Sequence, residues 1–244
     1  RDFSLRFGDI ALFYALVDAL QLPKRWRNKL RHYFWRPPVF HALLDRIAQG
    51  TRPEPDTLAT ALADKIASAD QAHAEEIVAA YLDAQGIPLA GNRSLREIAE
   101  RLLDHAADLR ADPLPQEVGT VIDYVLTVSA PPREACDKLA MIAKGAGLDI
   151  DAGLGAISRR FDRLEGEGVD LSRATFTAEF GRKLEYYSGL VFQIEAKGLD
   201  ETEPVAGGGR YDNLLTALGA PRPVPAVGSA IHTERLLAAV EGGA

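Results

Sequence analysis

From residue 9 onward the hydrophobic pattern of this chain changes its period once, near Ser172, and this change limits the folds that the sequence can adopt. Before that point apolar residues recur every three or four positions, as at Leu154, Ile157 and Phe161, which is typical of helices that pack by one face. After it apolar and polar residues alternate, as in residues 174–180, which is typical of half-buried strands. A long helical block followed by a run of strands predicts an α+β fold.

Residues 1–8 predict a further strand, because Phe3, Leu5 and Phe7 fall on one face of an alternating pattern. The chain opens at Arg1 in the middle of this pattern and without an initiator Met. We therefore expect the chain to be truncated at its N-terminus.

The helical block consists of separate amphipathic segments without a repeat of fixed period, which argues against a helical solenoid. Helices are predicted over residues 8–20, 24–35, 39–49, 56–65, 70–84, 94–109, 115–128, 132–144 and 151–164. The sixth of these helices begins with a capping-box pattern, Ser94 with Glu97 three residues later. Gly145 is well placed to end the eighth.

The strands predicted after the helical block cover residues 174–180, 190–195 and 223–231, and a last helix covers residues 233–240. We expect a sheet domain built from residues 1–22 and 170–244. The helical segment between them, residues 23–169, is expected to be an insertion into that domain.

Charge and composition exclude several classes of protein. The net charge is −7 and the isoelectric point is near 5.3, which disfavours a protein built mainly to wrap nucleic acid. No apolar run approaches the roughly 20 residues that span a bilayer and no signal peptide leads the chain, so we expect a cytoplasmic protein. The single cysteine, Cys136, excludes a disulfide framework, and its apolar neighbours favour a small core residue over a nucleophile.

The predicted helix over residues 24–35 is strongly basic and carries Trp26 on a narrow apolar stripe. Such a helix either contacts RNA or presents a solvated face over a tryptophan anchor, and we favour the solvated face. The histidines are scattered along the chain and there is one cysteine, so no metal site is predicted.

Three motifs follow one another in the last quarter of the chain. They are the first tail motif, GRKLEYYSGLVFQI (residues 181–194), the second, AGGGRYDNLL (206–215), and the third, PAVGSAIHTERLL (225–237). Tyr186 and Tyr187 are expected at the start of a strand, with their rings on opposite sides of the sheet. A phenol hydroxyl both donates and accepts, which suits an imidazole or amide edge. The alternative is that both tyrosines are ordinary amphipathic sheet residues.

The second tail motif contains the glycine run Gly207, Gly208 and Gly209, which would weaken the interior of a strand. Such a run lets the backbone pass close to a ligand or to another strand. It is neither a P-loop nor a dinucleotide fingerprint, and by itself it indicates a bulge or a turn. Arg210 and Tyr211 are expected to enter the start of a helix, where backbone N–H groups favour a carboxylate or a phosphate.

Together the tail motifs resemble the catalytic domain of class II histidyl-tRNA synthetases and their paralogue, the regulatory subunit of ATP phosphoribosyltransferase. The synthetase pattern reads Arg-Gly-Leu-Asp-Tyr-Tyr, Gly-Gly-Gly-Arg-Tyr-Asp and Pro-Ala-Val-Gly-Phe-Ala-x-Gly-x-Glu-Arg-Leu. Residues 182–187, 207–212 and 225–236 stand at these positions. Residues 1–22 resemble the strand and helix that follow the second class II motif, so the resemblance covers roughly residues 1–22 and 172–241. It implies a class II synthetase-like antiparallel sheet with flanking helices and a large helical insertion.

The resemblance implies a histidine-like pocket lined by Tyr187 and Tyr211, together with Tyr186 and the glycine run. It places Arg182 near the reacting carboxylate and α-phosphate, and Arg235 at the position of the third-motif arginine that holds ATP. The residue types alone leave both arginines open to a surface role.

Departures from the synthetase pattern favour the regulatory paralogue. His232 stands where the synthetase has glycine, so its ring would intrude where an adenylate needs a close backbone approach. Lys183 replaces a glycine beside Arg182. The chain ends soon after the last predicted helix, without an anticodon-binding domain, and its acidic charge suits tRNA poorly. We therefore expect His232 and Arg235 to mark a vestigial ATP site.

The resemblance thus implies a non-catalytic regulatory subunit, without cofactor or metal, for the ATP phosphoribosyltransferase step that opens histidine biosynthesis. The implied partner is the catalytic phosphoribosyltransferase chain, a glycosyltransferase, and the implied effector is histidine. Self-association is expected, whereas contacts with membrane or nucleic acid are not. One alternative is a histidyl-tRNA synthetase core, intact or degenerate, that activates histidine with ATP. Another is a structural scaffold whose pocket is vestigial.

Overall fold

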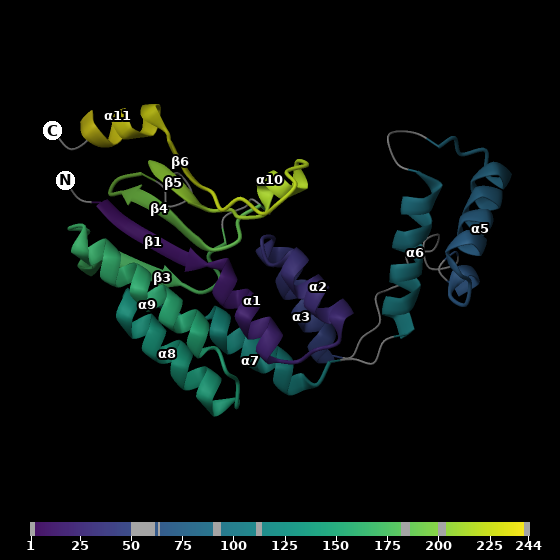
Figure 1. Ribbon diagram of the computed structural model, residues 1–244, viewed down its shortest axis with the longest axis horizontal. Coiled ribbons are helices and arrows are strands. Elements are labelled where there is room, and N and C mark those ends of the chain that lie inside the picture. The colour runs from purple at the N-terminus through teal and green to yellow at the C-terminus, as the bar shows by residue number, and fades with distance from the viewer. Residues whose placement is uncertain are drawn as a thin grey trace. The chain divides into compact units, whose positions relative to one another are not determined.

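The computed structural model describes residues 3–49, 62, 64–89, 94–110, 114–181, 186–199 and 204–241 (Figure 1). The chain divides into two compact units. The first unit contains residues 1–44 and 117–244, and the second contains residues 45–116.

The first unit is built on a six-stranded sheet with the strand order β2-β3-β1-β4-β5-β6. The strands are β1 (Phe3–Asp9), β2 (Ser129–Ala130), β3 (Ala174–Thr177), β4 (Leu190–Ala196), β5 (Ala206–Arg210) and β6 (Val227–Ile231). The predicted opening strand is confirmed, with Leu5 and Phe7 buried and Phe3 largely exposed. The sequence did not predict β2, because two residues are too few to show a period.

The sheet is mixed, whereas the sequence predicted an antiparallel one. Neighbouring strands run antiparallel except for β1 and β3, which pair in parallel with Leu5 opposite Ala174 and Phe7 opposite Phe176. A parallel pair requires a long connection that returns the chain to the same end of the sheet. The helices between β1 and β3 provide that connection, and the predicted α+β class is confirmed.

Helices cover the sheet of the first unit on the side of β1 and β3, as Figure 1 shows for α8 and α9. The helices assigned to this unit are α1 (Ile10–Ala19), α2 (Lys24–Tyr33), most of α7 (Gln116–Leu126), α8 (Pro132–Gly145), α9 (Asp151–Gly166), α10 (Leu214–Ala217) and α11 (Thr233–Glu241). Phe161 of α9 is fully buried, and its ring meets Phe7 edge to face at 5.8 Å and Phe176 at 6.3 Å. This aromatic contact fastens α9 to the two parallel strands.

A second aromatic cluster joins α1, α2 and the first part of α3 (Pro37–Gln49). The rings of Phe13 and Phe34 stack at 3.9 Å, and Phe40 meets Phe13 edge to face at 5.5 Å. All three side chains are buried. Leu30 and Phe34 of the predicted apolar stripe therefore anchor α2, whereas Trp26 is only partly buried.

The second unit consists of α5 (Gln71–Ala84), α6 (Leu95–Arg110) and the residues that pack against them. Its core is formed by Leu62, Ile66, Ala74, Val78 and Ala99. The predicted capping box at the start of α6 is present: Glu97 accepts a hydrogen bond from the Ser94 N–H at 2.8 Å, and the Glu97 N–H donates to Ser94 Oγ at 3.3 Å. Most of the helix predicted over residues 56–65 lies outside the described residues.

The compact unit of residues 45–116 is narrower than the predicted insertion, residues 23–169. The helices α2, α8 and α9, which the prediction placed in the insertion, fall in the same unit as the sheet, because their apolar faces are covered within that unit. An amphipathic period shows that a helix has a face to bury but not which neighbour covers it.

Helix ends differ from the sequence predictions by a few residues. Gly145 is the last residue of α8, and the left-handed glycine beyond that helix is Gly147, with φ of 68°. Within the described parts of the chain, no helix is long and apolar enough to cross a membrane.

Candidate functional site

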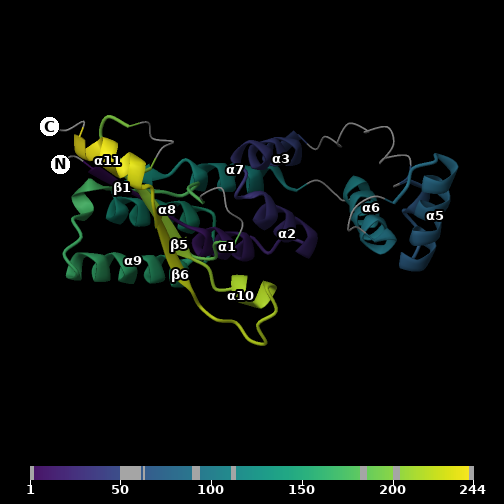
Figure 2. The same ribbon diagram turned by 90° about the horizontal axis from the view of Figure 1, so that it is seen from above.

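The three tail motifs come together in the sheet, where they form β4, β5 and β6 and the segments that flank them. Val191 of β4 pairs with Gly209 of β5, and Gly209 pairs with Gly228 of β6. In Figure 2, β6 runs between α10 and α11, which lie at its two ends. The candidate site is the cluster of tyrosines that these strands support.

Each of two tyrosines lies against a glycine from the next tail motif. A Cβ added at Gly209 would lie 2.8 Å from Cδ1 of Tyr187, and a Cβ added at Gly228 would lie 2.5 Å from the hydroxyl oxygen of Tyr211. Carbon atoms in ordinary contact are about 3.5–4.0 Å apart. These glycines therefore provide the space for the two rings, which is the close backbone approach that the sequence predicted.

Tyr186, Tyr187 and Tyr211 form one aromatic cluster. The centroids of Tyr186 and Tyr187 are 4.5 Å apart, and Tyr211 lies 5.3 Å from Tyr186 and 6.1 Å from Tyr187. The hydroxyl of Tyr186 donates to that of Tyr187 at 3.4 Å. Tyr187 is 5% exposed and Tyr186 is 37% exposed, so the cluster has a buried and an open end.

The prediction that Tyr186 and Tyr187 point to opposite sides of the sheet is wrong. Alternation applies within a strand, and both tyrosines precede β4, which begins at Leu190. Outside a strand, the pleat does not direct successive side chains to opposite faces, and the two rings face one another.

The glycine run is neither a bulge nor a turn. Gly207, Gly208 and Gly209 lie within β5 and pair on both sides, with β4 and with β6. A Cβ added at Gly208 would lie 2.2 Å from the carbonyl oxygen of Gly228. The sheet accepts glycine here because the neighbouring backbone leaves no space for a side chain.

The sequence also misplaced the start of a helix at Arg210 and Tyr211. Arg210 ends β5, and the Tyr211 N–H donates to the carbonyl of Ala226 at 2.8 Å. The helix α10 begins later, at Leu214, and is four residues long. Arg210 and Tyr211 therefore do not stand at the N-terminus of a helix.

A polar group that the sequence did not predict lies beside the cluster. Arg210 Nε donates to Asp212 Oδ2 at 2.8 Å, and the Asp212 N–H donates to Ser188 Oγ at 2.9 Å. Asp212 Oδ1 is buried and has no hydrogen-bond partner among the described residues. The site thus offers a guanidinium, a carboxylate oxygen with unused acceptor capacity and phenol hydroxyls. The second tail motif contained this signal, because Arg210 and Asp212 flank Tyr211.

A partly buried ion pair lies close to this polar group. Asp9 ends β1 opposite Leu190, is 2% exposed and caps α1 by accepting the Leu12 N–H at 3.1 Å. Arg160 of α9 donates to its other carboxylate oxygen. Burial raises the pKa of Asp9, and the positive charges of Arg160 and, more weakly, Arg210 oppose that rise.

The remaining site residues of the prediction lie elsewhere or outside the described residues. Arg182, like Lys183, lies outside them. Arg235 donates to the carbonyl of Pro204 at 3.3 Å, and the His232 N–H donates to the carbonyl of Val205 at 2.8 Å. His232 and Arg235 thus hold the start of α11 to the segment before β5.

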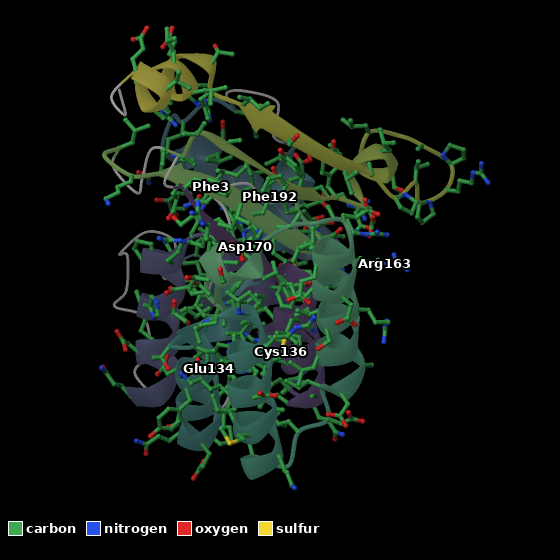
Figure 3. The ribbon with its side chains drawn as sticks, turned by 90° about the vertical axis from the view of Figure 1, so that its left-hand side faces the viewer. Phe3, Glu134, Cys136, Arg163, Asp170 and Phe192 are labelled. Carbon is green, nitrogen blue, oxygen red and sulfur yellow. The ribbon has the colours of Figure 1, made fainter. Side chains whose placement is uncertain are left out.

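Cys136 lies on α8, among the helices, whereas Phe192 lies in the sheet (Figure 3). The thiol is half-buried, and burial raises its pKa. A raised pKa disfavours the thiolate that a nucleophile requires. Across the described residues, no group of three or more His, Cys, Asp or Glu side chains is arranged to hold a metal ion.

A family model described as histidyl-tRNA synthetase matches residues 75–236, which is more than half of the chain. The chain belongs to the histidyl-tRNA synthetase family. The resemblance read from the tail motifs is therefore confirmed.

Curated relatives of high similarity are named ATP phosphoribosyltransferase regulatory subunit. The relative from Agrobacterium fabrum (strain C58) is 37% identical over 239 residues, which cover 98% of this chain and 62% of that protein. The relative from Mesorhizobium japonicum is 34% identical over 236 residues, covering 97% of this chain and 62% of that protein. The chain spans about three fifths of the length of these relatives.

Solved structures share the fold. Histidyl-tRNA synthetase from Nostoc sp. PCC 7120 is 15% identical and matches with a TM-score of 0.52, covering 99% of this chain and 42% of that one. An ATP phosphoribosyltransferase regulatory subunit/histidyl-tRNA synthetase from Bacillus halodurans C is 16% identical, with a TM-score of 0.50 and coverages of 98% and 44%. At these identities the likeness shows the synthetase-like fold alone.

Proposed function

We propose that this chain is part of a non-catalytic regulatory subunit required for the ATP phosphoribosyltransferase step, the first step of histidine biosynthesis. The observation that carries the proposal is the 37% identity, over 98% of this chain, to a protein named as that regulatory subunit. Its partner is then the catalytic phosphoribosyltransferase chain, with which it forms a cytoplasmic hetero-oligomer.

We further propose that the tyrosine cluster binds histidine as a feedback effector. Tyr186, Tyr187 and Tyr211 present hydroxyls that both donate and accept, which suits the two nitrogens of an imidazole. The unused oxygen of Asp212 suits a cationic amino group, and Arg210 suits a carboxylate. Histidine carries all three kinds of group.

Feedback requires that histidine binds one arrangement of the assembly more tightly than another. A differential affinity of about 1–3 kcal/mol is typical of such coupling. Adding histidine to the assembled complex should therefore lower its phosphoribosyltransferase activity. If the complex requires this subunit for activity but ignores histidine, the subunit is a scaffold and not a sensor.

A second candidate function is histidine activation by a histidyl-tRNA synthetase core, and the matching family model favours it. His232 and Lys183 stand against it, because each replaces a glycine of the synthetase pattern. Histidine-dependent exchange of pyrophosphate into ATP separates the two functions. Exchange above the background of a no-histidine control would establish the synthetase and overturn the regulatory proposal.

Replacing Tyr187 by Phe should weaken histidine binding by about 1 kcal/mol, or roughly fivefold in Kd, because the pocket loses one hydroxyl partner. The measurement is calorimetric titration of histidine into the intact protein. Tyr124→Phe is the matched control, since Tyr124 is 62% exposed on α7 and should bind as the wild type does. If the wild-type protein gives no heat of binding at millimolar histidine, the proposal of a histidine pocket is wrong.

Replacing Gly228 by Ala should weaken histidine binding about tenfold while leaving the fold intact. The added Cβ meets the hydroxyl end of Tyr211, a side chain that can rotate away, so the site is displaced and the backbone is not. Calorimetry gives the affinity, and thermal unfolding by circular dichroism gives the stability. An unchanged affinity would show that Tyr211 does not line the pocket.

A further inference from the structure

Helix α2 lies in a concentrated positive segment of an otherwise acidic chain. Residues 18–36 contain six Lys and Arg residues against one acidic residue, Asp18, a net charge of +5 in a chain whose total is −7. All other residues together therefore carry −12. Such asymmetry indicates a surface that faces negative charge.

The positions of the charged residues in α2 lower the stability of the helix. Its first turn has no acidic residue, and Pro23 provides no side-chain cap. Lys24 and Arg25 thus sit at the positive end of the helix dipole. Arg25 with Lys29, and Arg27 with Arg31, are like-charged pairs four residues apart, which also disfavour the helix. A helix face that only keeps the protein soluble does not require positive charges at the helix N-terminus or like-charged pairs four residues apart.

Asp18 compensates part of the positive charge of this segment. Its carboxylate accepts from Arg31 Nη2 at 2.5 Å and lies 3.6 Å from Arg27 Nη1. Lys24 is exposed at the start of the helix, and the segment keeps its net positive charge.

Aromatic rings lie among the cations. The guanidinium carbon of Arg25 and the ammonium of Lys29 lie 5.9 and 5.6 Å from the centre of the Trp26 ring, and Arg36 lies 4.1 Å from Trp35. Tryptophan and arginine are the residues most enriched among those that dominate the energy of protein interfaces.

The opposite side of α2 is anchored in the core and leads to the candidate site. Leu30 is fully buried, and Phe34, at the end of the helix, stacks on Phe13. A Cβ added at Gly181 would lie 3.2 Å from Cε1 of Phe34. Gly181 begins the first tail motif, so the buried side of the α2 segment packs against the start of that motif.

We infer that the basic face of α2 docks on a carboxylate-rich face of a protein partner. That partner is the catalytic phosphoribosyltransferase chain, an identification that rests on the proposed function. A protein surface fits better than a nucleic acid, because ten helical residues span only about 15 Å. A longer polyanion would extend beyond this patch and meet the rest of this chain, which carries a net negative charge.

The test reverses three charges, Lys24→Glu, Arg25→Glu and Lys29→Glu, in the intact protein. The matched control reverses three exposed cations on other segments, Lys144→Glu, Arg159→Glu and Arg222→Glu, and has the same net charge. Interferometry measures binding of the catalytic chain at low and at moderate salt. We expect the α2 variant to bind at least about tenfold more weakly and to lose the salt dependence, and the control to change by less than about threefold.

Separate measurements distinguish failure of this inference from failure of the proposed function. Thermal unfolding and histidine titration should match the wild type in the α2 variant, since glutamates in the first turn favour the helix. Equal loss of binding in both variants, or none in the α2 variant, overturns the inference. If the wild type does not bind the catalytic chain, the proposed function fails.

Two polyanionic probes then decide the inference without that partner. Fluorescence anisotropy measures binding of a labelled oligoglutamate peptide and of a labelled tRNA. Oligoglutamate binding that only the α2 variant loses supports the inference. If no oligoglutamate binding is seen, the inference fails and the basic face has no acidic partner. If tRNA binds more tightly than oligoglutamate and only the α2 variant loses that binding, the inference fails in favour of a nucleic acid.

Discussion

The Gly8→Ala variant is expected to lose at least about 3 kcal/mol of folding free energy, and its melting temperature should fall by roughly 6–12 °C. Gly8 lies in β1 opposite Val191, and a Cβ added there would lie 1.8 Å from the carbonyl oxygen of Phe180. The clash is with backbone, which cannot rotate away as a side chain can. The segment after β3 would have to leave β1, and with it the entry to the first tail motif.

Thermal and urea unfolding of the intact protein measure this loss. Gly145→Ala is the control, because Gly145 is the last residue of α8 and a Cβ added there has no neighbour within 4 Å. Its stability should be unchanged or higher by up to about 1 kcal/mol, since alanine favours the helix. Equal stabilities of the Gly8 variant and the wild type would show that Phe180 does not lie over β1 as described.

The Arg160→Met variant is expected to lose about 1.5–3 kcal/mol at neutral pH, because the buried carboxylate of Asp9 loses its charged hydrogen-bond partner. Asp9 would keep the Leu12 N–H as a partner but would lose the guanidinium. Unfolding in urea measures the loss. Arg159→Met, on the exposed neighbouring position of the same helix, should cost less than about 0.5 kcal/mol.

The loss in Arg160→Met should grow as the pH rises. Burial holds the pKa of Asp9 above its value in the unfolded chain, so above that unfolded value the folded protein binds more protons. The contribution of Asp9 to stability therefore falls as pH rises through the raised pKa. Without Arg160 the pKa of Asp9 rises further, and the gap between variant and wild type should widen as the pH rises above the pKa of Asp9 in the unfolded chain.

The double variant Asp9→Asn with Arg160→Met tests the cause. A neutral amide still accepts the Leu12 N–H and needs no counter-charge, so the double variant should be more stable than Arg160→Met alone at pH 7. It should also lack the added pH dependence. A double variant as unstable as the single one would assign the loss to packing of the arginine stem.

Features that depend on neighbours in the chain were predictable from the sequence. The capping box at Ser94 and Glu97 is present, and α5, α8 and α9 lie within a few residues of their predicted bounds. The alternating pattern predicted β1 and β4 in the same way. Helical period, strand alternation and capping are set by residues a few positions apart, which a sequence displays directly.

The candidate site was predictable only where its residues share a motif. Tyr186, Tyr187 and Tyr211 were named from the sequence and lie together, and Arg210 and Asp212 stood beside them unassigned. Asp9 was missed, because its partner Arg160 lies 151 residues away and neither residue belongs to a tail motif. A charged residue next to a predicted strand gives no sign of whether it is buried.

By itself, the sequence determined the α+β class, the family and the order of the tail motifs, because these follow from local period and residue identity. The tertiary structure decided that β1 and β3 pair in parallel, that the glycine run lies inside β5 and that Gly209 and Gly228 make space for Tyr187 and Tyr211. It also paired Asp9 with Arg160. Each of these depends on which distant segments meet, and strand pairing and burial decide that only when the whole chain folds.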